Sequence, residues 1–129
     1  MKQTLLNRFL RYVALDTQSD PNSDTVPSTN KQLTLANALA TELKTFGVTD
    51  VSLDSKGYVM ASIPSNIDRD ITPIGFIAHM DTSPDMPGNN VKPQIIEGYD
   101  GGDIVLNTEK NIHLSPAEFP DLLRYKGQT

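Results

Sequence analysis

The chain has 129 residues, of which 37% are hydrophobic and 21% are charged, and its 16 acidic residues against 11 lysines and arginines give a net charge of −5. This composition is typical of a globular protein, and the length allows one domain with a hydrophobic core. An acidic balance without a basic stripe argues against nucleic acid as a partner. The lack of cysteine excludes disulfides and thiolate metal sites, so any metal must be held by histidine and carboxylate side chains.

The amino-terminal stretch is not expected to be a signal peptide, because Arg8 and Arg11 interrupt its apolar residues. No stretch approaches the roughly 18 uncharged apolar residues that a membrane span needs. We therefore expect a soluble, cytoplasmic protein that has no membrane partner.

The first part of the chain is predicted to contain two helices. Apolar residues at helical spacing predict an amphipathic helix over residues 3–15, and a loop rich in Asp, Ser, Asn and Pro follows it. Ser28 or Thr29 is expected to cap a second helix, which runs to Phe46 and stops at Gly47. The predicted core positions of this helix are Leu33, Ala36, Ala40 and Leu43.

The next part is predicted to form strands. Residues 51–63 alternate around a polar "DSKG" turn, which is the pattern of a hairpin that ends at Pro64. Residues 71–78, "ITPIGFIA", are nearly all apolar, which predicts a strand covered on both faces in the middle of a sheet, entered at Pro73. This order of elements is that of the opening of an α/β sandwich.

The signals beyond Asp81 are weaker. Residues 91–107 offer two short strand candidates around a glycine pair, and Leu122 and Leu123 begin a new apolar patch close to the last residue. We therefore expect the chain to be truncated.

A candidate metal site follows the predicted buried strand. His79 and Asp81 should project to the same side of an extended segment, while Met80 turns back toward the core. A metal-binding imidazole usually donates its second N–H to a carboxylate or a carbonyl, and Asp81 could be that partner. A histidine at a strand end can equally be a hydrogen-bonded structural residue, and three residues form a short pattern. The triplet alone leaves both interpretations open.

The other polar candidates are weaker. His113 lies in a polar stretch without a spaced ligand, which favours a surface or hydrogen-bonding role. Asp100 and Asp103 flank a glycine pair without the spacing of a calcium loop and are interpreted as turn residues. Asp16 and Ser19 lie in the first loop, where a role beside the substrate and a role in ending the helix are both open.

The order of several segments resembles the M20 family of zinc aminoacylases and peptidases. These are "YVALDTQSD", "PSTNKQLTLANALATEL", "SKGYVMASIPS" and "IGFIAHMDTSPD", and the likeness continues to the last residue. The resemblance implies a three-layer αβα sandwich with a mixed sheet, of which residues 1–129 would be the amino-terminal portion of the catalytic domain. It further implies two bridged zinc ions and release of the amino-terminal residue from tripeptides.

The resemblance also assigns roles to individual residues. It makes His79 the first zinc ligand and Asp81 the catalytic-motif aspartate that orients it. The bridging aspartate, the general-base glutamate, the remaining ligands and the lid or dimerisation domain would lie beyond Thr129. Because a zinc site draws at least three protein ligands, the 129-residue chain alone is expected to be inactive.

Two alternatives remain at this stage. His79 and Asp81 would serve equally in another M20 hydrolase, namely a dipeptidase, a carboxypeptidase or a deacylase. A non-catalytic αβα binding module is the alternative of a different class. The resemblance leaves open whether the intact protein is a homodimer.

Overall fold

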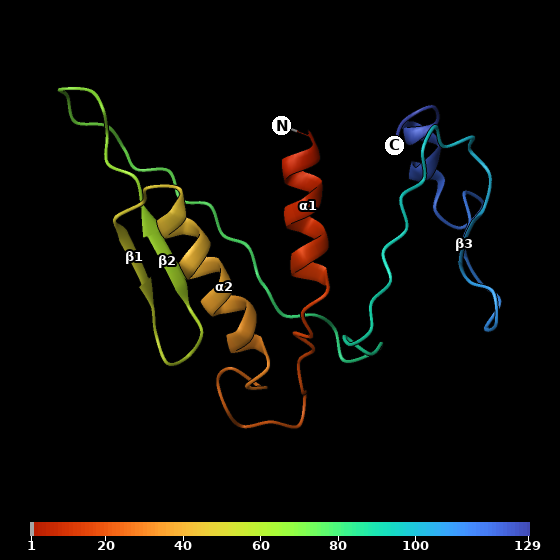
Figure 1. Cartoon of the computed structure of the whole chain (residues 1–129), viewed down its shortest axis with the longest axis horizontal. Helices are drawn as coiled ribbons and strands as arrows, with labels where there is room; N and C mark the ends of the chain where they lie inside the picture. Colours follow the sequence, from red (N-terminus) through yellow and green to blue (C-terminus); the bar gives the residue numbers. More distant parts are fainter. Residues whose placement is uncertain (1) are drawn as a thin grey trace. The chain divides into compact units, whose positions relative to one another are not determined.

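The structure is a computed structural model that describes residues 2–129, and it divides into two units (Figure 1). The first unit ends at Lys92 and the second is Pro93–Thr129. Helices and small antiparallel sheets confirm the α/β class at a coarse level. The strands of the described residues form two separate two-stranded sheets, and no single mixed sheet is present among them. No helix in residues 2–129 has both the length and the apolar character needed to cross a membrane.

Both predicted helices of the first unit are present. Helix α1 is Lys2–Val13 and helix α2 is Gln32–Thr45. Gln32, Ala36 and Ala40 recur at a spacing of four on one face of α2 and are buried, as is Leu35. The predicted core positions Ala36 and Ala40 are therefore confirmed. Leu33 and Leu43 are only half-buried.

A carboxylate on α2 joins the two helices. Glu42 accepts hydrogen bonds from Arg8 Nε at 3.0 Å and from Arg11 at 2.7 Å, and also from the Tyr12 hydroxyl. The Arg8 guanidinium additionally lies 4.8 Å from the centre of the Phe46 ring. The Tyr12 hydrogen bond, followed by those of the two arginines, lowers the pKa of Glu42 to about 2. Charge-assisted hydrogen bonds therefore fasten α1 to α2.

The start of α2 differs from the prediction. Lys31 occupies the N-cap position and makes no side-chain capping bond. The hydroxyl of Ser28 accepts from the Asp20 backbone and the Gln32 side chain, and the hydroxyl of Thr29 donates to the Gln18 carbonyl. The prediction of a Ser28 or Thr29 cap was wrong, because both hydroxyls fasten the preceding loop instead.

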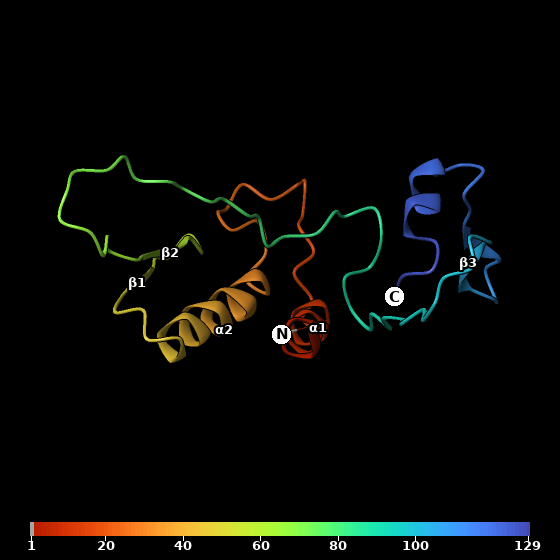
Figure 2. The same cartoon turned by 90° about the horizontal axis from the view of Figure 1, so that it is seen from above.

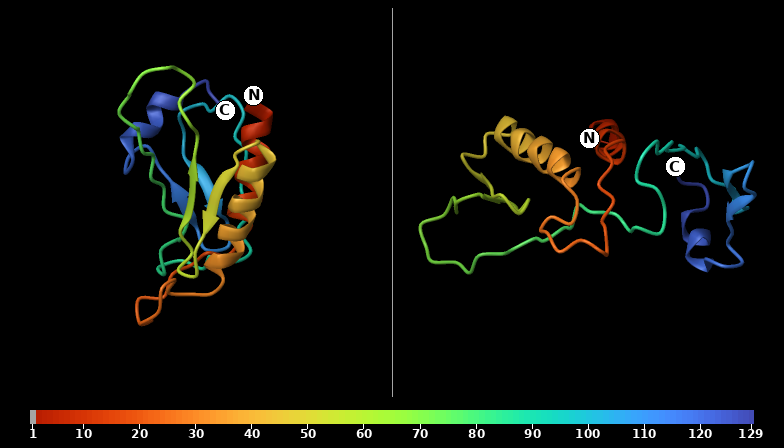
Figure 3. Two further views of the ribbon diagram at one scale, coloured as in Figure 1. Left: turned by 90° about the vertical axis from the view of Figure 1, so that its left-hand side faces the viewer. Right: turned by 90° about the horizontal axis from the view of Figure 1, so that it is seen from below.

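The predicted hairpin and helix stop are confirmed. Strands β1, Asp50–Leu53, and β2, Val59–Ser62, pair antiparallel and lie against α2 (Figure 3). Gly47 ends α2 with a φ of 82°, in the left-handed region that glycine adopts without strain. Asp54 builds the hairpin turn by accepting from the backbone N–H groups of Lys56 and Tyr58, each at 2.9 Å.

The segment 71–78 is not a strand, which corrects the prediction. It runs as an irregular connection, drawn in green in Figure 2, and Phe76 and Ile77 are 94% and 101% exposed. A buried strand needs a hydrogen-bonded neighbour on each side. Within residues 2–129, β1 and β2 pair with each other and neither pairs with this segment, so its apolar side chains have no sheet to enter.

The second unit is a small hairpin followed by a short helix. Its elements are β3, Ile104–Asn107, β4, Ile112–Leu114, and the 3-10 helix η1, Pro120–Tyr125. Tyr99 is buried in this unit, exchanges backbone hydrogen bonds with Gly127 and Gln128, and donates its hydroxyl to the Gly102 carbonyl. Of the two strand candidates in residues 91–107, only the second formed. The apolar patch at Leu122 became η1.

Candidate functional site

His79 and Asp81 form a hydrogen-bonded pair. Nδ1 of His79 lies 3.1 Å from Oδ1 of Asp81, and the side chains are 85% and 46% exposed. Because an ionised carboxylate only accepts, this hydrogen bond requires the proton on Nδ1, and in the neutral ring the lone pair then lies on Nε2. In this tautomer Nε2 can bind a metal while Asp81 orients the ring. Met80, between the two, is half-buried, and so is Asp81, so burial does not separate the two faces that the alternation of an extended segment predicts.

The pair lies at a different place in the fold from the one predicted. The sequence predicts a pair at the end of a buried strand, and in the structure the pair lies at the end of an irregular segment. Backbone pairing begins immediately after Asp81. Thr82 forms a parallel bridge with Gln18, donating its N–H to the Thr17 carbonyl at 3.1 Å and accepting from the Ser19 N–H at 2.9 Å.

The first loop therefore supports the segment that carries the pair. The Ser19 hydroxyl also donates to the Thr82 carbonyl at 2.9 Å. Asp16 accepts from the Gln18 N–H and from Lys31 Nζ, each at 3.0 Å, and these two bonds lower its pKa. A substrate-side role and a helix-ending role were both open for Asp16 and Ser19. In the structure, both residues fix the loop that holds the segment after Asp81.

The described residues do not form a complete metal site. No group of three or more His, Asp and Glu side chains within residues 2–129 is placed to hold a metal ion. One outward-facing imidazole with a supporting carboxylate fits the first ligand of a zinc site, but zinc sites use at least three protein ligands. These residues by themselves do not fit a bound zinc ion.

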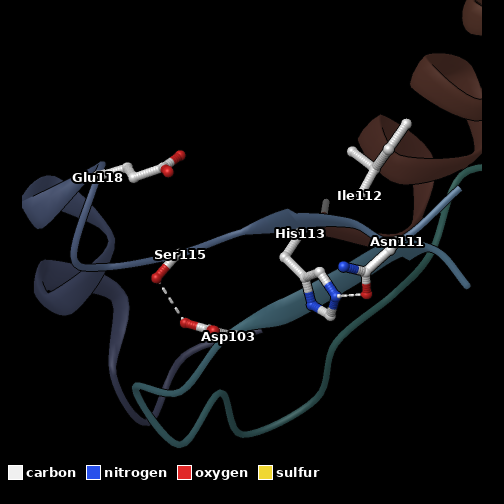
Figure 4. A pocket seen from close by; sticks show the side chains of 6 residues that line it. All are labelled: Asp103, Asn111, Ile112, His113, Ser115 and Glu118. Atoms are coloured by element: carbon white, nitrogen blue, oxygen red, sulfur yellow. Dashed lines mark hydrogen bonds between the residues drawn. The ribbon is translucent and has the colours of Figure 1, made fainter.

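The remaining histidine belongs to the second unit. His113 Nε2 lies 2.9 Å from Oδ1 of Asn111, beside a shallow pocket of about 560 Å³ (Figure 4). Asp103 lines the same pocket and accepts from the Ser115 hydroxyl at 2.6 Å, while Asp100 accepts from the Gly102 N–H across a tight turn. The hydrogen-bonding role predicted for His113 and the turn role of Asp100 are confirmed. Asp103 instead ties its strand to Ser115.

Comparison with known proteins places the chain among sequences similar to bacterial peptidases. It is 58% identical to peptidase T of Clostridium acetobutylicum over 127 residues and 58% identical to peptidase T of Bacillus velezensis over 129 residues. It is also 60% identical to peptidase T of Clostridium botulinum over 124 residues. These matches cover 98%, 100% and 96% of this chain. The resemblance to a peptidase is thereby confirmed, although no family model matches the chain.

The likeness concerns one part of longer proteins. The matched region is 31%, 32% and 30% of the three relatives. The chain thus spans about a third of the length of the curated relatives that it matches.

Proposed function

We propose that the intact protein is a tripeptide aminopeptidase that uses two zinc ions, and that this chain is the amino-terminal portion of its catalytic domain. The observation that carries the proposal is 58% identity to peptidase T along the whole chain. The match extends over 129 residues, all of this chain, so it is far longer than a short motif. The proposed substrate is a tripeptide with a free amino terminus, and the proposed location is the cytoplasm.

The proposed role of His79 follows from its tautomer. With Nδ1–H donated to Asp81, the outward Nε2 would be one zinc ligand, and Asp81 would keep the ring oriented and increase its basicity. When bound, two zinc ions supply a water of lowered pKa and stabilise the charge that develops on the scissile carbonyl. The other ligands and the general base would come from residues outside this chain.

The proposed fold of the intact protein is a three-layer αβα sandwich with a mixed sheet. Segment 71–78 supports this extension, because a continuous apolar run is typical of a central strand and this one lacks strand neighbours among the described residues. In the intact protein it would become the strand that ends at His79.

The proposal is tested by assaying the protein made from the complete reading frame. The substrates are a tripeptide, the same tripeptide with an acetylated amine, a dipeptide and an N-acylated amino acid. We expect release of the first residue from the free tripeptide only, with activity lost to a chelator and restored by zinc. Preference for the dipeptide, for the acylated amino acid or for cleavage at the carboxyl end would instead indicate another hydrolase of the same kind. Inactivity on all four would support a non-catalytic module.

A further inference from the structure

The Gln18 side chain connects the first loop to the segment after Asp81. Its Nε2 donates to the Pro84 carbonyl at 3.0 Å and to the Met86 carbonyl at 2.9 Å, while its Oε1 accepts from Lys31 Nζ at 3.3 Å. The amide of Gln18 therefore donates both of its N–H groups to one turn, and its oxygen accepts from Lys31. Only an amide side chain can donate twice and accept at once in this way.

The contact between loop and segment leaves little free space. A β-carbon built on Gly88 would lie 2.5 Å from Oδ1 of Asp16 and 3.1 Å from Cβ of Gln18. Segment 82–88 thus lies directly on the loop, and the loop is itself fixed by the Asp16–Lys31 ion pair at 3.0 Å. The segment that precedes His79 lacks such support, because residues 71–78 have no strand partner within the described part of the chain.

The position of Asp81 is therefore set from its carboxyl side. Thr82 is held by two backbone hydrogen bonds, and the Gln18 amide fixes the turn that follows it. The Asp81 carboxylate in turn orients the imidazole of His79. Gln18 is thus linked to the ring by its hydrogen bonds to residues 84 and 86, by the backbone from there back to Asp81, and by the Asp81–His79 hydrogen bond.

We infer that Gln18 is a positioning residue, which fixes residues 82–86 and thereby holds Asp81 where it keeps His79 in its Nδ1–H form. This inference rests on the proposed function, since it assigns Gln18 to the support of that metal ligand. Gln18 does not touch His79, and it is not assigned a part in the chemical step.

The test reads the His79 ring by nitrogen NMR in the 129-residue chain, at a pH well above the ordinary histidine pKa of about 6.5. The chain has two histidines, so His113 in the other unit is an internal reference. Gln18→Glu keeps the shape of the side chain but turns acceptor oxygens toward two carbonyls. We expect the Nδ1–H signal of His79 to weaken in favour of the Nε2–H form, while the His113 signal stays in place.

Two further variants separate position from charge and from unfolding. Gly88→Ala changes no charge and pushes the segment from the loop, so it should move the His79 signal in the same direction. Gln3→Glu makes the same chemical change on α1, where the Gln3 amide donates to Asn7 at 2.8 Å, and should leave the signal unchanged. Backbone signals of α2 report whether each variant is folded. If Gln18→Glu unfolds the chain, Gly88→Ala alone decides.

An unchanged His79 signal in folded Gln18→Glu, or in Gly88→Ala, would overturn the inference, as would a wild-type His79 without the Nδ1–H form. In the intact protein we expect Gln18→Glu to lower kcat about 10- to 100-fold with little change in KM, as for other residues that support metal ligands. An intact protein that is inactive while the His79 signal still responds to Gln18→Glu would count against the proposed function and not against this inference.

Discussion

Nδ1 of His79 lies 3.1 Å from Oδ1 of Asp81, although only one residue separates them and both side chains reach solvent. An exposed pair of this kind contributes little to stability. Its consequence is chemical, because it fixes which ring nitrogen carries the proton and leaves the other available to a metal.

The first prediction concerns Asp81 in the intact protein. Asp81→Ala removes the acceptor, and we expect kcat/KM on a tripeptide to fall about 10- to 100-fold. Asp81→Asn keeps an oxygen acceptor but loses the charge, so its effect should be smaller. Asp70→Asn removes an exposed carboxylate from the same connection and serves as the control. Equal activities for Asp81→Ala and Asp70→Asn would contradict the orienting role.

The second prediction concerns the pH dependence of stability. The pKa of Glu42 is lowered from 4.5 to about 2, so the folded state holds this proton less tightly than the unfolded state. The stabilisation from Glu42 is thus fully present above about pH 4.5 and is lost as the pH falls toward 2. Glu42→Gln should lower the free energy of unfolding at neutral pH by about 1–2 kcal/mol and flatten its decline in acid.

Urea unfolding of the 129-residue chain between pH 6 and pH 2.5, about the window that the two pKa values define, measures this dependence. Glu118→Gln removes the same charge from the second unit and is the control. Parallel stability curves for wild type and Glu42→Gln would show that Glu42 does not fasten α1 to α2.

The third prediction concerns the β1–β2 turn. Asp54 accepts two backbone hydrogen bonds through one oxygen, from Lys56 and Tyr58. Asp54→Ala should therefore lower the free energy of unfolding by about 1 kcal/mol, whereas Asp54→Asn, which retains the acceptor, should lower it less. Urea unfolding followed by circular dichroism measures both. A larger loss for asparagine than for alanine would contradict the turn geometry.

The fourth prediction concerns association of the 129-residue chain. Ile74, Phe76 and Ile77 are 81%, 94% and 101% exposed in one continuous stretch, and exposed apolar segments without strand partners promote association. We expect light scattering to show a mass that rises with concentration and that is reduced in the double variant Phe76→Ser, Ile77→Ser. Ile67→Ser, outside the stretch, should change it little. Monodisperse wild-type monomers across a wide concentration range would contradict this expectation.

Local sequence signals predicted the elements whose contacts are close in the chain. Helical spacing predicted α1 and α2, and the polar turn predicted the β1–β2 hairpin, because the hydrogen bonds of these elements join near neighbours. The strand at residues 71–78 was predicted wrongly, since a buried strand depends on neighbours that no local pattern specifies. A strand at residues 71–78 would need a larger sheet than the two-stranded sheets that the described residues form.

The candidate site shows the same division. His79 and Asp81 could be paired from their spacing alone, because alternation puts them on one side. The support from Gln18 could not be predicted in this way. Gln18 bonds to Pro84 and Met86, which lie 66 and 68 positions further along the chain. A glutamine in a loop rich in Asp and Ser carries no signal of such a partner. The close approach of Gly88 to the first loop could not be predicted either, because the lack of a side chain at Gly88 matters only where the loop contacts it.

The most direct test of the proposed metal ligand measures zinc binding and tripeptide hydrolysis together in the intact protein, for His79→Gln and for His113→Gln. His113 is hydrogen-bonded to Asn111 in the second unit and has no part in the proposed site. We predict that His79→Gln loses zinc affinity and turnover by at least about 10- to 100-fold, while His113→Gln retains both. Zinc affinity and turnover unchanged in His79→Gln would contradict the assignment of His79 as a metal ligand.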